Sequence, residues 1–421
     1  MNTEEQFLVV GAGPLGLAMA KALGEADVPY VQVEATDHVG GNWAHGVYET
    51  AHIISSRKTT EYPDYPMPSH YPDFPSGKQM CAYYNDFADA HGLRDNIRFN
   101  SPLTHCAPVD GLWQCTFADG TVERFKGVYV ANGHHWKRNF PAWVEQFEGE
   151  VLHSKDYKRP DDLRGKRVLV LGGGNSGCDL ASEAARVGAN ADWSLRRGYW
   201  ILPKSVMGRP VIEFVTPSVP VFVQRLFVKA MVRLVIGRYT DYGLPHPDHE
   251  PFDRHPTVNT EVFHYLAHGK IQPRPDVERV EGKTVFFTDG TSAEYDLIAC
   301  GTGFQVCFPF FDEGLVSVKG KVATLIGGAL VEGQRHLYIV GAYQPRYGLG
   351  PVVRPYVQML ARWATLQDEL SVPLANVLMA LGQTAPVTEV MDPHKSIREV
   401  RRTRWTDHLV RWQGRRMEVA A

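Results

Sequence analysis

Two stretches of the chain share the glycine spacing G-x-G-x-x-G, which can hold the phosphates of a dinucleotide. In such a turn the first glycine permits a sharp bend, the second lets the backbone approach a pyrophosphate, and the third lets a helix pack closely on the preceding strand. The helix that begins there adds free N–H groups and a partial positive charge. The first stretch contributes Gly11, Gly13, Pro14 and Gly16, and the second contributes Gly172, Gly174, Asn175, Ser176 and Gly177.

The side chains found about 20 residues beyond each motif predict which nucleotide it binds. Glu34 follows the first motif, and a carboxylate there accepts hydrogen bonds from ribose hydroxyls and repels a 2′-phosphate. Arg196 and Arg197 follow the second motif, and guanidinium groups bind a 2′-phosphate through charge-assisted bonds. The first site therefore suits FAD or NAD, and the second suits NADPH. The alternative for the two arginines is that they are only solvated surface residues.

Each motif needs a strand before it and a helix after it. Short apolar runs predict strands at 7–10 and 30–33 around a helix that ends at Gly24, and a strand at 168–171 before a helix over 180–187. A further strand begins at Leu297 and runs into a third glycine turn, formed by Gly301, Thr302 and Gly303. Proline-rich stretches at 61–77 and 244–256 are expected to be irregular, because proline removes a backbone donor and fixes φ.

Two nucleotide sites of opposite preference indicate hydride transfer from NADPH to a flavin. The sequence therefore predicts a flavin-dependent oxidoreductase. Flavoprotein disulfide reductases carry a redox-active cysteine pair beside the flavin, but the first cysteine of this chain is Cys81, well beyond "GGNWAHGVYE". Electrons from the reduced flavin are expected to pass to oxygen, to a quinone or directly to the substrate.

The composition is that of a globular protein with more than one domain. The chain has 421 residues, 44% of them hydrophobic and 22% charged, and a net charge of -3, which selects neither nucleic acid nor an anionic membrane. The N-terminus shows no secretion signal, and no apolar window of 18 or more residues is free of charges. In the segment 219–236 Arg225, Lys229 and Arg233 recur every fourth residue, which predicts a surface helix with a solvated basic stripe; membrane contact is the alternative.

Neither the cysteines nor the histidines predict a metal site. The six cysteines are scattered, without C-x-x-C, and fit a reducing cytoplasm. Five histidines in irregular segments were considered as ligands and none has a carboxylate at a recognised ligand spacing. They are His134, His135, His246, His249 and His255.

One further pattern, F-x-G-x-x-x-H-x-x-x-Y, lies between the two glycine motifs and consists of Phe147, Gly149, His153 and Tyr157. Its position and spacing resemble the fingerprint of the flavin-containing monooxygenases, which are class B flavoprotein oxygenases. Other segments resemble that family in the same order. "GAGPLGL" resembles its FAD cradle, and "GGNW" (with Gly41, Asn42 and Trp43) resembles a segment that the family places near the flavin. "GGGNSGCDLA" resembles its NADPH cradle, "CGTGF" resembles a linker, and "IVGAYQPRYGLG" (with Gln344) resembles the final strand that closes over FAD.

The resemblance implies FAD and NADPH as cofactors, and O2 and a small molecule as substrates. In that family NADPH reduces FAD, the reduced flavin and O2 form a C4a-hydroperoxide, and a soft nucleophilic nitrogen or sulfur takes the distal oxygen. In the fingerprint, Gly149 would allow a tight backbone path, His153 would hold the linker or the NADPH cradle, and Phe147 and Tyr157 would pack the seam between domains. The alternative is that all four are interface core without a catalytic role.

Three departures from the family pattern affect the expected chemistry. Ser55 stands where the family usually has an asparagine that is implied to bond the oxygenated flavin, so Ser55 is the catalytic candidate here. The first A-T-G of the family is "ANG" at 131–133, and the C-terminus lacks the apolar anchor of mammalian members. Baeyer–Villiger relatives usually have a tryptophan at the position of Tyr157, so the tyrosine of this chain favours N- or S-oxygenation. The alternatives are a Baeyer–Villiger or keto-acid (indole-type) monooxygenase and an uncoupled NADPH oxidase or redox sensor.

We expect an α/β fold with two Rossmann-like domains of the three-layer ββα/βαβ type. The FAD domain would comprise residues 1–160 and 292–421, and the NADPH domain residues 161–291. An apolar stretch near 201–242 is expected to be a helical insertion at the substrate entrance. The expected protein is cytoplasmic, without membrane anchor, metal or nucleic-acid partner, and a homodimer is the candidate assembly.

Overall fold

The computed structural model describes residues 2–214, 219–346, 348–386, 390–391 and 393–420, and its chain forms two compact units. The first unit comprises Met1–His45, Arg57–His134 and Val306–Ala421, and the second comprises Gly46–Ser56 and His135–Gln305. These boundaries differ from the expected ones, because residues 135–160, 292–305 and 46–56 all belong to the second unit. Strands on both sides of the expected NADPH domain complete its sheet, as described below.

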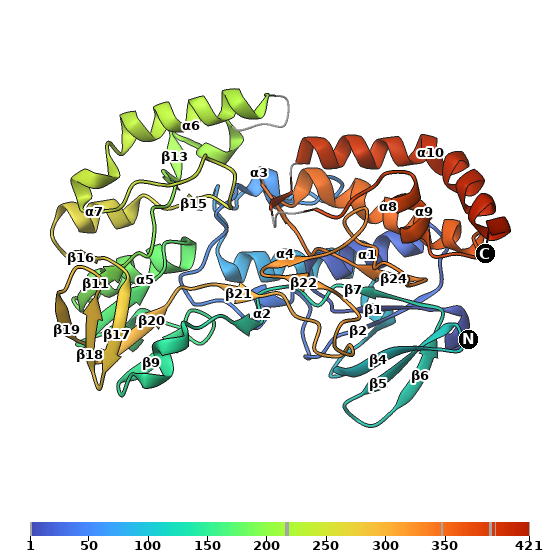
Figure 1. The fold of residues 1–421 in the computed structure, drawn as a ribbon, viewed down its shortest axis with the longest axis horizontal. Coiled ribbons are helices and arrows are strands. Elements are labelled where there is room, and N and C mark those ends of the chain that lie inside the picture. The colour runs from blue at the N-terminus through green and yellow to red at the C-terminus, as the bar shows by residue number, and fades with distance from the viewer. Residues whose placement is uncertain (1, 215–218, 347, 387–389, 392, 421) are drawn as a thin grey trace. The chain divides into compact units, whose positions relative to one another are not determined.

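The first unit is built on a five-stranded sheet whose strands are all parallel (Figure 1). The central strand β1 (Phe7–Val10) is buried along its whole length and leads into the first glycine motif and helix α1 (Pro14–Glu25). The sheet order is β24 (Leu337–Ile339), β7 (Gly127–Val130), β1, β2 (Tyr30–Val33) and β3 (Ile97–Arg98). Burial along the whole length of β1, β7 and β24 explains why few polar residues occur in these three strands.

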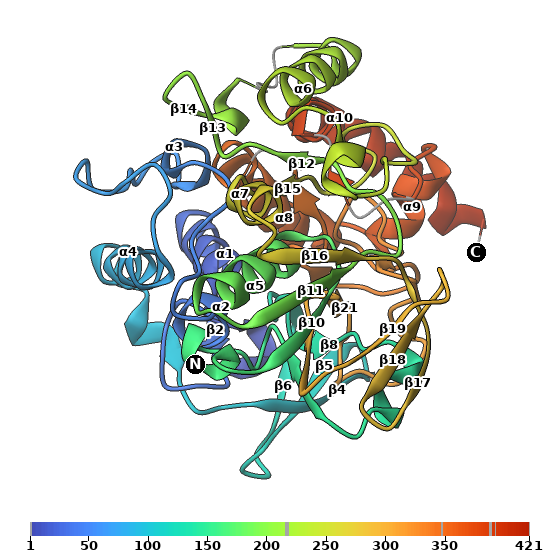
Figure 2. The same cartoon turned by 90° about the vertical axis from the view of Figure 1, so that its left-hand side faces the viewer.

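The second unit repeats this arrangement (Figure 2). Its central strand β10 (Arg167–Leu171) leads into the second glycine motif and helix α5 (Asn175–Arg186). The order is β16 (Ile271–Arg274), β11 (Asn190–Ser194), β10, β20 (Leu297–Cys300) and β9 (Glu150–His153), again all parallel. The edge strand β9 precedes β10 in the chain, whereas the equivalent β24 of the first unit comes late.

Each unit also carries a three-stranded antiparallel sheet. In the first unit it consists of β4 (Leu103–Val109), β5 (Leu112–Phe117) and β6 (Val122–Phe125), and in the second of β17 (Val277–Glu281), β18 (Thr284–Phe287) and β19 (Ser292–Glu294). A parallel sheet with helices and a small antiparallel sheet in each unit confirms the expected α/β class with two Rossmann-type domains.

The segment 201–242 is only partly helical, and its residues 215–218 lie outside the described part. It contains the short strands β12 (Ile201–Leu202), β13 (Ser205–Val206) and β14 (Arg209–Pro210), the helix α6 (Val221–Val235) and the 3-10 turn η6 (Tyr239–Tyr242). The surface helix is confirmed as α6. Of its three basic residues, Arg233 is exposed, and Arg225 and Lys229 are partly exposed and form ion pairs with a neighbouring loop.

Helix α6 has several exposed apolar side chains. Phe222, Leu226 and Leu234 have exposed fractions of 67%, 63% and 85%. Among the described residues, no helix combines the length and the apolar character needed to cross a bilayer.

The remaining elements frame the two sheets. Helix α4 begins at Gly77 with a capping box between Ser76 and Gln79, which explains where the irregular proline-rich stretch ends. The segment 244–256 contains no helix or strand, as predicted. The other main elements are α2 (Asn42–His45), α3 (Arg57–Thr60), α4 (Gly77–Ala90), β15 (Thr257–Val258), α7 (Glu261–Ala267), β25 (Gln344–Pro345), α8 (Gly350–Asp368), α9 (Leu374–Ala380) and α10 (Pro393–Ala420).

Candidate dinucleotide-binding sites

The first glycine motif forms a tight turn that only glycines can make. Gly11 has a φ of 101°, and a Cβ placed on it would lie 2.6 Å from the carbonyl oxygen of Ala131. A Cβ on Gly16 would lie 2.0 Å from the carbonyl oxygen of Gly11, so the helix packs directly on the turn. Gly13 is the N-cap of α1, and Pro14 is its first residue. The free N–H groups of this helix end are thus presented beyond β1.

The second motif has nearly the same geometry. Gly172 also has a φ of 101°, with a notional Cβ 2.5 Å from the Gly301 oxygen, and a Cβ on Gly177 would lie 2.0 Å from the Gly172 oxygen. Gly174 caps α5, and no other atom lies within 4 Å of its notional Cβ. The two motifs are therefore equivalent dinucleotide cradles, one in each unit.

The "GGNW" segment packs on the first cradle. A Cβ on Gly41 would lie 2.9 Å from the Cα of Gly13, and the Gly40 N–H donates to the Ala12 oxygen at 3.0 Å. Asn42 and Trp43 follow in the one-turn helix α2. This close approach explains the paired glycines and places the segment beside the cradle of the first unit.

Glu34 is held against the same cradle. Its side chain is buried, and one carboxylate oxygen accepts a hydrogen bond from the Ala12 N–H at 2.7 Å. The other oxygen accepts from the N–H and the hydroxyl of Thr36, both at 3.0 Å. These bonds fix the carboxylate next to the turn, where a ribose of a bound dinucleotide needs an acceptor.

The two arginines follow β11 in the second unit. Arg196 is exposed, and Arg197 is half-buried with its guanidinium carbon 5.3 Å from the ring centre of Tyr199. A Cβ on Gly173 would lie 2.3 Å from the ring of Tyr199, so the arginine-bearing segment packs on the second cradle. The structure thus links Arg197 to the turn through the ring of Tyr199, and it leaves Arg196 exposed beside it in the chain.

His153, at the end of β9, holds the third glycine turn. Its Nε2 bonds the carbonyl oxygen of Gly303 at 3.0 Å, and its Nδ1 accepts the N–H of Lys155 at 3.1 Å. Nε2 therefore carries the proton, and burial lowers the pKa of His153, which keeps the ring neutral. A Cβ on Gly301 would lie 2.6 Å from Gly177, so the turn that His153 holds abuts the second cradle.

Comparison with known proteins agrees with this geometry. The profile of the "Flavin-binding monooxygenase-like" (FMO-like) family matches residues 4–386. The chain belongs to that family. It is 31% identical over 393 residues to "Flavin-containing monooxygenase 5" of Oryctolagus cuniculus, covering 86% of this chain and 73% of the rabbit protein. This monooxygenase is thus a FAD-dependent enzyme that uses NADPH.

Solved structures share its fold. A flavin-containing monooxygenase from Stenotrophomonas maltophilia has a TM-score of 0.66 at 21% identity, over 87% of this chain and 99% of that one. A closed cyclohexanone monooxygenase has a TM-score of 0.72 at 17% identity, over 96% and 97%. At these identities the likeness establishes the fold and carries no statement about substrate.

The residues of both cradles fit the two cofactors. A side chain at Gly11, Gly16, Gly172 or Gly177 would fill the space in which the turn must lie, so the backbone of each cradle is kept bare. Bare backbone N–H groups at a helix N-terminus suit a pyrophosphate. The cradle with the buried Glu34 suits FAD, and the cradle followed by Arg196 and Arg197 suits NADPH.

The fingerprint lies wholly within the second unit of the monooxygenase. Phe147 belongs to an apolar cluster with Leu169 and Ile298, and the Tyr157 hydroxyl donates to the carboxylate of Glu183 on α5. The expectation that Phe147 and Tyr157 pack a seam between domains is therefore wrong: both are core of one unit. A Cβ on Gly149 would lie 2.4 Å from the Phe147 ring, which explains the glycine.

The segment 46–56 is fastened to helix α5 by two carboxylates one turn apart. The Thr50 hydroxyl donates to Glu183, and the Tyr48 hydroxyl donates to Asp179 at 2.6 Å. Burial raises the pKa of Glu183 above its ordinary value of 4.5. Sequence reasoning missed these anchors, because the partners lie more than 100 positions apart and no local pattern marks them.

Ser55 and Gln344 lie in different units. Ser55 is half-buried and belongs to the segment 46–56, so the hydroxyls of Tyr48 and Thr50 position the chain that carries it. Gln344 lies in β25 of the first unit, where its amide nitrogen is 3.0 Å from Nε2 of His134. Burial lowers the pKa of His134, so a neutral ring faces that amide.

One group of side chains among the described residues has the composition of a metal site. Asp37, His38 and His45 have potential ligand atoms within 4.8 Å of one another, and all three are exposed. None of the five histidines considered from the sequence is part of this group. Asp37 and His38 follow Glu34 in the chain, and His45 is the last residue of α2, just beyond the "GGNW" segment.

Proposed function

We propose that this flavin monooxygenase oxygenates a nitrogen or sulfur atom of a small organic molecule. The observation that supports this substrate class is the likeness to "Dimethylaniline monooxygenase [N-oxide-forming] 2" of Oryctolagus cuniculus, which is 28% identical over 417 residues and covers 89% of this chain. The likeness to cyclohexanone monooxygenase is confined to the fold, at 17% identity. The sequence similarity therefore favours N- or S-oxygenation over insertion of oxygen beside a carbonyl.

In this proposal the two cradles divide the work. The first, with Gly11, Gly13 and Gly16, holds the pyrophosphate of FAD, and Glu34 accepts the ribose hydroxyls. The second holds NADPH, and Arg196 and Arg197 bind its 2′-phosphate. The bound flavin supplies the redox and oxygen chemistry, which no side chain of the protein can provide.

The protein's own residues orient the reactants and exclude water. A tertiary amine or a thioether brings its own electron pair, so the reaction needs no base to create a nucleophile. His153 keeps the turn at Gly303 in place and stays neutral because it is buried. Ser55 would donate one hydrogen bond to the oxygen-bearing group, where an asparagine amide would offer two donors.

Product analysis with the FAD-loaded enzyme tests the proposal. N,N-dimethylaniline, methyl phenyl sulfide and cyclohexanone would each be supplied with NADPH and O2, and the N-oxide, sulfoxide or lactone would be measured together with H2O2. We expect N-oxide or sulfoxide in amounts close to the NADPH consumed. Formation of lactone alone would establish the Baeyer–Villiger alternative, and H2O2 equal to NADPH with every substrate would establish an uncoupled oxidase.

Location and assembly complete the proposal. We propose a cytoplasmic location, supported by six cysteines that form no disulfide in the structure, and a homodimer as the candidate assembly. Cell fractionation tests the first point and would contradict it if the protein sediments with membranes. Light scattering of the purified enzyme tests the second, since a mass of 47.1 kDa would indicate a monomer.

A further inference from the structure

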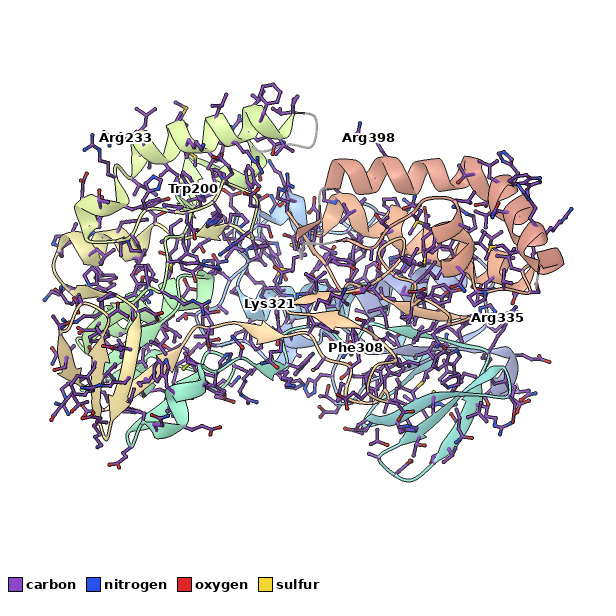
Figure 3. All side chains as sticks on the ribbon, viewed as in Figure 1. Trp200, Arg233, Phe308, Lys321, Arg335 and Arg398 are labelled. Atoms are coloured by element: carbon purple, nitrogen blue, oxygen red, sulfur yellow. The ribbon has the colours of Figure 1, made fainter. Side chains whose placement is uncertain are left out.

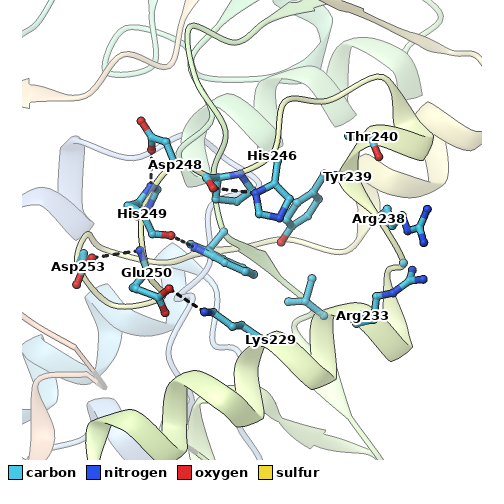
Figure 4. Close-up of a pocket in the computed structure, with 14 residues that line it drawn as sticks. Lys229, Arg233, Arg238, Tyr239, Thr240, His246, Asp248, His249, Glu250 and Asp253 are labelled. Carbon is cyan, nitrogen blue, oxygen red and sulfur yellow. Dashed lines mark hydrogen bonds and ion pairs between the residues drawn. The ribbon is translucent and has the colours of Figure 1, made fainter.

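A pocket of about 860 Å³ lies in the second unit, apart from both glycine motifs. Helix α6 forms one wall, the turn at 237–240 and the loop at 246–253 form the others, and Trp200 also lines the pocket (Figures 3 and 4). The volume is in the range of pockets that hold small organic ligands. Neither the comparisons nor the proposed chemistry assigns this pocket a role.

The charges of the pocket are arranged unevenly. Its three carboxylates lie on one side, and each already has a cationic or imidazole partner (Figure 4). Glu250 is 2.7 Å from Lys229, Asp248 is 2.9 Å from His249, and Asp253 pairs with Arg225.

Two arginines line the pocket on the side away from the three carboxylates (Figure 4). Arg233 is in the last turn of α6 and Arg238 precedes η6. Within the part of the chain that the structure describes, neither forms an ion pair with a carboxylate. Two guanidinium groups that line one pocket without a protein anion are suited to bind an oxyanion from a ligand.

The floor of the pocket is aromatic and rigid. The ring of Trp200 meets those of Tyr239 and His246 edge-to-face, with centres 6.2 Å apart in each case. The indole N–H donates to the His249 oxygen at 2.7 Å, and the Tyr239 hydroxyl is bonded to both backbone groups of Ile201. Because their polar atoms are satisfied, the rings offer apolar surface to a planar group.

We infer that this pocket binds a small aromatic monocarboxylate, with the carboxylate between Arg233 and Arg238 and the ring against Trp200. The two arginines supply the charge and the direction, and the aromatic floor supplies the contact area. A polyphosphate suits the pocket less well, because its additional charges would approach Asp248, Glu250 and Asp253. The inference does not depend on which substrate the enzyme oxygenates.

Binding of benzoate to the FAD-loaded enzyme, measured by isothermal titration calorimetry, tests the inference. Benzamide has the same ring without the charge, and acetate has the charge without the ring. We expect benzoate to bind at least ten-fold more tightly than either of them. Equal affinity for benzamide would overturn the anion site, and equal affinity for acetate would overturn the aromatic floor.

Substitutions assign the binding to the pocket. Arg233→Gln and Arg238→Gln are each expected to weaken benzoate binding at least five-fold, and both lie on the surface, so the fold should persist; circular dichroism checks this. Arg209→Gln, an exposed arginine on β14 of the same unit, is the matched control and should leave the affinity unchanged. Loss of affinity in the control equal to that in the two variants would contradict the assignment.

Two competing ligands separate this pocket from the dinucleotide sites. If saturating NADP+ abolishes benzoate binding, the site belongs to the cofactor and the inference is wrong. If AMP binds more tightly than benzoate and Arg233→Gln weakens AMP binding, the ligand class is a nucleotide and the assignment of a monocarboxylate is wrong. Benzoate binding that persists with NADP+ present, and exceeds that of AMP, supports the inference.

Discussion

The hydroxyl of Tyr157 donates a hydrogen bond to the carboxylate of Glu183 and thereby links the end of the fingerprint to the NADPH-cradle helix α5. Both side chains are buried, with exposed fractions of 1% and 3%. The same carboxylate receives the hydroxyl of Thr50, so one acid holds two segments that are about 100 residues apart. The bond is therefore a structural anchor of the second unit.

Removing this hydroxyl should destabilise the protein. Tyr157→Phe leaves the ring in place and takes one donor from a buried carboxylate, which costs about 1–3 kcal/mol. We expect a lower midpoint in urea unfolding and a higher NADPH KM, because α5 carries the cradle. Tyr199→Phe is the comparison, because the Tyr199 hydroxyl does not donate to a buried acid. An equal loss of stability in that variant would contradict the role of Tyr157 as an anchor.

The buried acid also predicts a pH dependence. Burial raises the pKa of Glu183 above 4.5, so the folded state holds its proton more tightly than the unfolded state. The free energy of unfolding should therefore fall as the pH rises from 4.5 through the raised value. Glu183→Gln should lose this slope, whereas Glu145→Gln, at an exposed position of the same unit, should keep it. Urea titrations between pH 4.5 and 7.5 measure both.

A matched pair of glycine substitutions separates the cofactors. Gly16→Ala and Gly177→Ala introduce the same 2.0 Å clash with a turn oxygen, one in each cradle. We expect Gly16→Ala to purify without the yellow flavin colour, and Gly177→Ala to keep the colour but lose reduction by NADPH. The absorbance at 450 nm per chain and its bleaching by anaerobic NADPH report the two outcomes. Loss of flavin from both variants alike would contradict the division of roles.

The arginines after β11 should set the preference for the phosphorylated nucleotide. Charge-assisted bonds are worth about 1.5–3 kcal/mol each, so Arg196→Gln and Arg197→Gln should raise the KM for NADPH at least ten-fold. The KM for NADH should change little, because NADH has no 2′-phosphate. Arg209→Gln serves as the control. If the two KM values rose together, the arginines would act on the fold and not on the phosphate.

Replacing Ser55 by asparagine should improve coupling. An amide offers two donor hydrogens and a longer reach than a hydroxyl. We expect Ser55→Asn to release less H2O2 per NADPH oxidised, with the NADPH KM unchanged, and Ser55→Ala to release more. Ser205→Asn, on β13 of the same unit, controls for the change in side chain. Unchanged peroxide release in both Ser55 variants would remove this residue from the proposed site.

Much of the fold could be predicted from the sequence, because the elements around each glycine motif depend on neighbouring residues. The strands β1 and β2 have the predicted limits, and α1 ends one residue beyond the predicted Gly24. The unit boundaries could not be predicted, because β20 belongs to this sheet only by pairing with β10, and β9 only by pairing with β20. The anchors at Asp179 and Glu183 and the pocket at Trp200 likewise arise from segments distant in sequence, for which a period of 2 or 3.6 residues gives no signal.

The late position of β24 has a consequence for folding during synthesis. Strand β7 waits for its outer neighbour until about 200 further residues have left the ribosome, which takes roughly 10–40 s at 5–20 residues per second. By then every strand of the other parallel sheet, from β9 to β20, is already available. The nascent polypeptide thus holds every strand of its nicotinamide module first, while the outer edge of β7 in the flavin module stays unpaired and exposed to other chains during this interval.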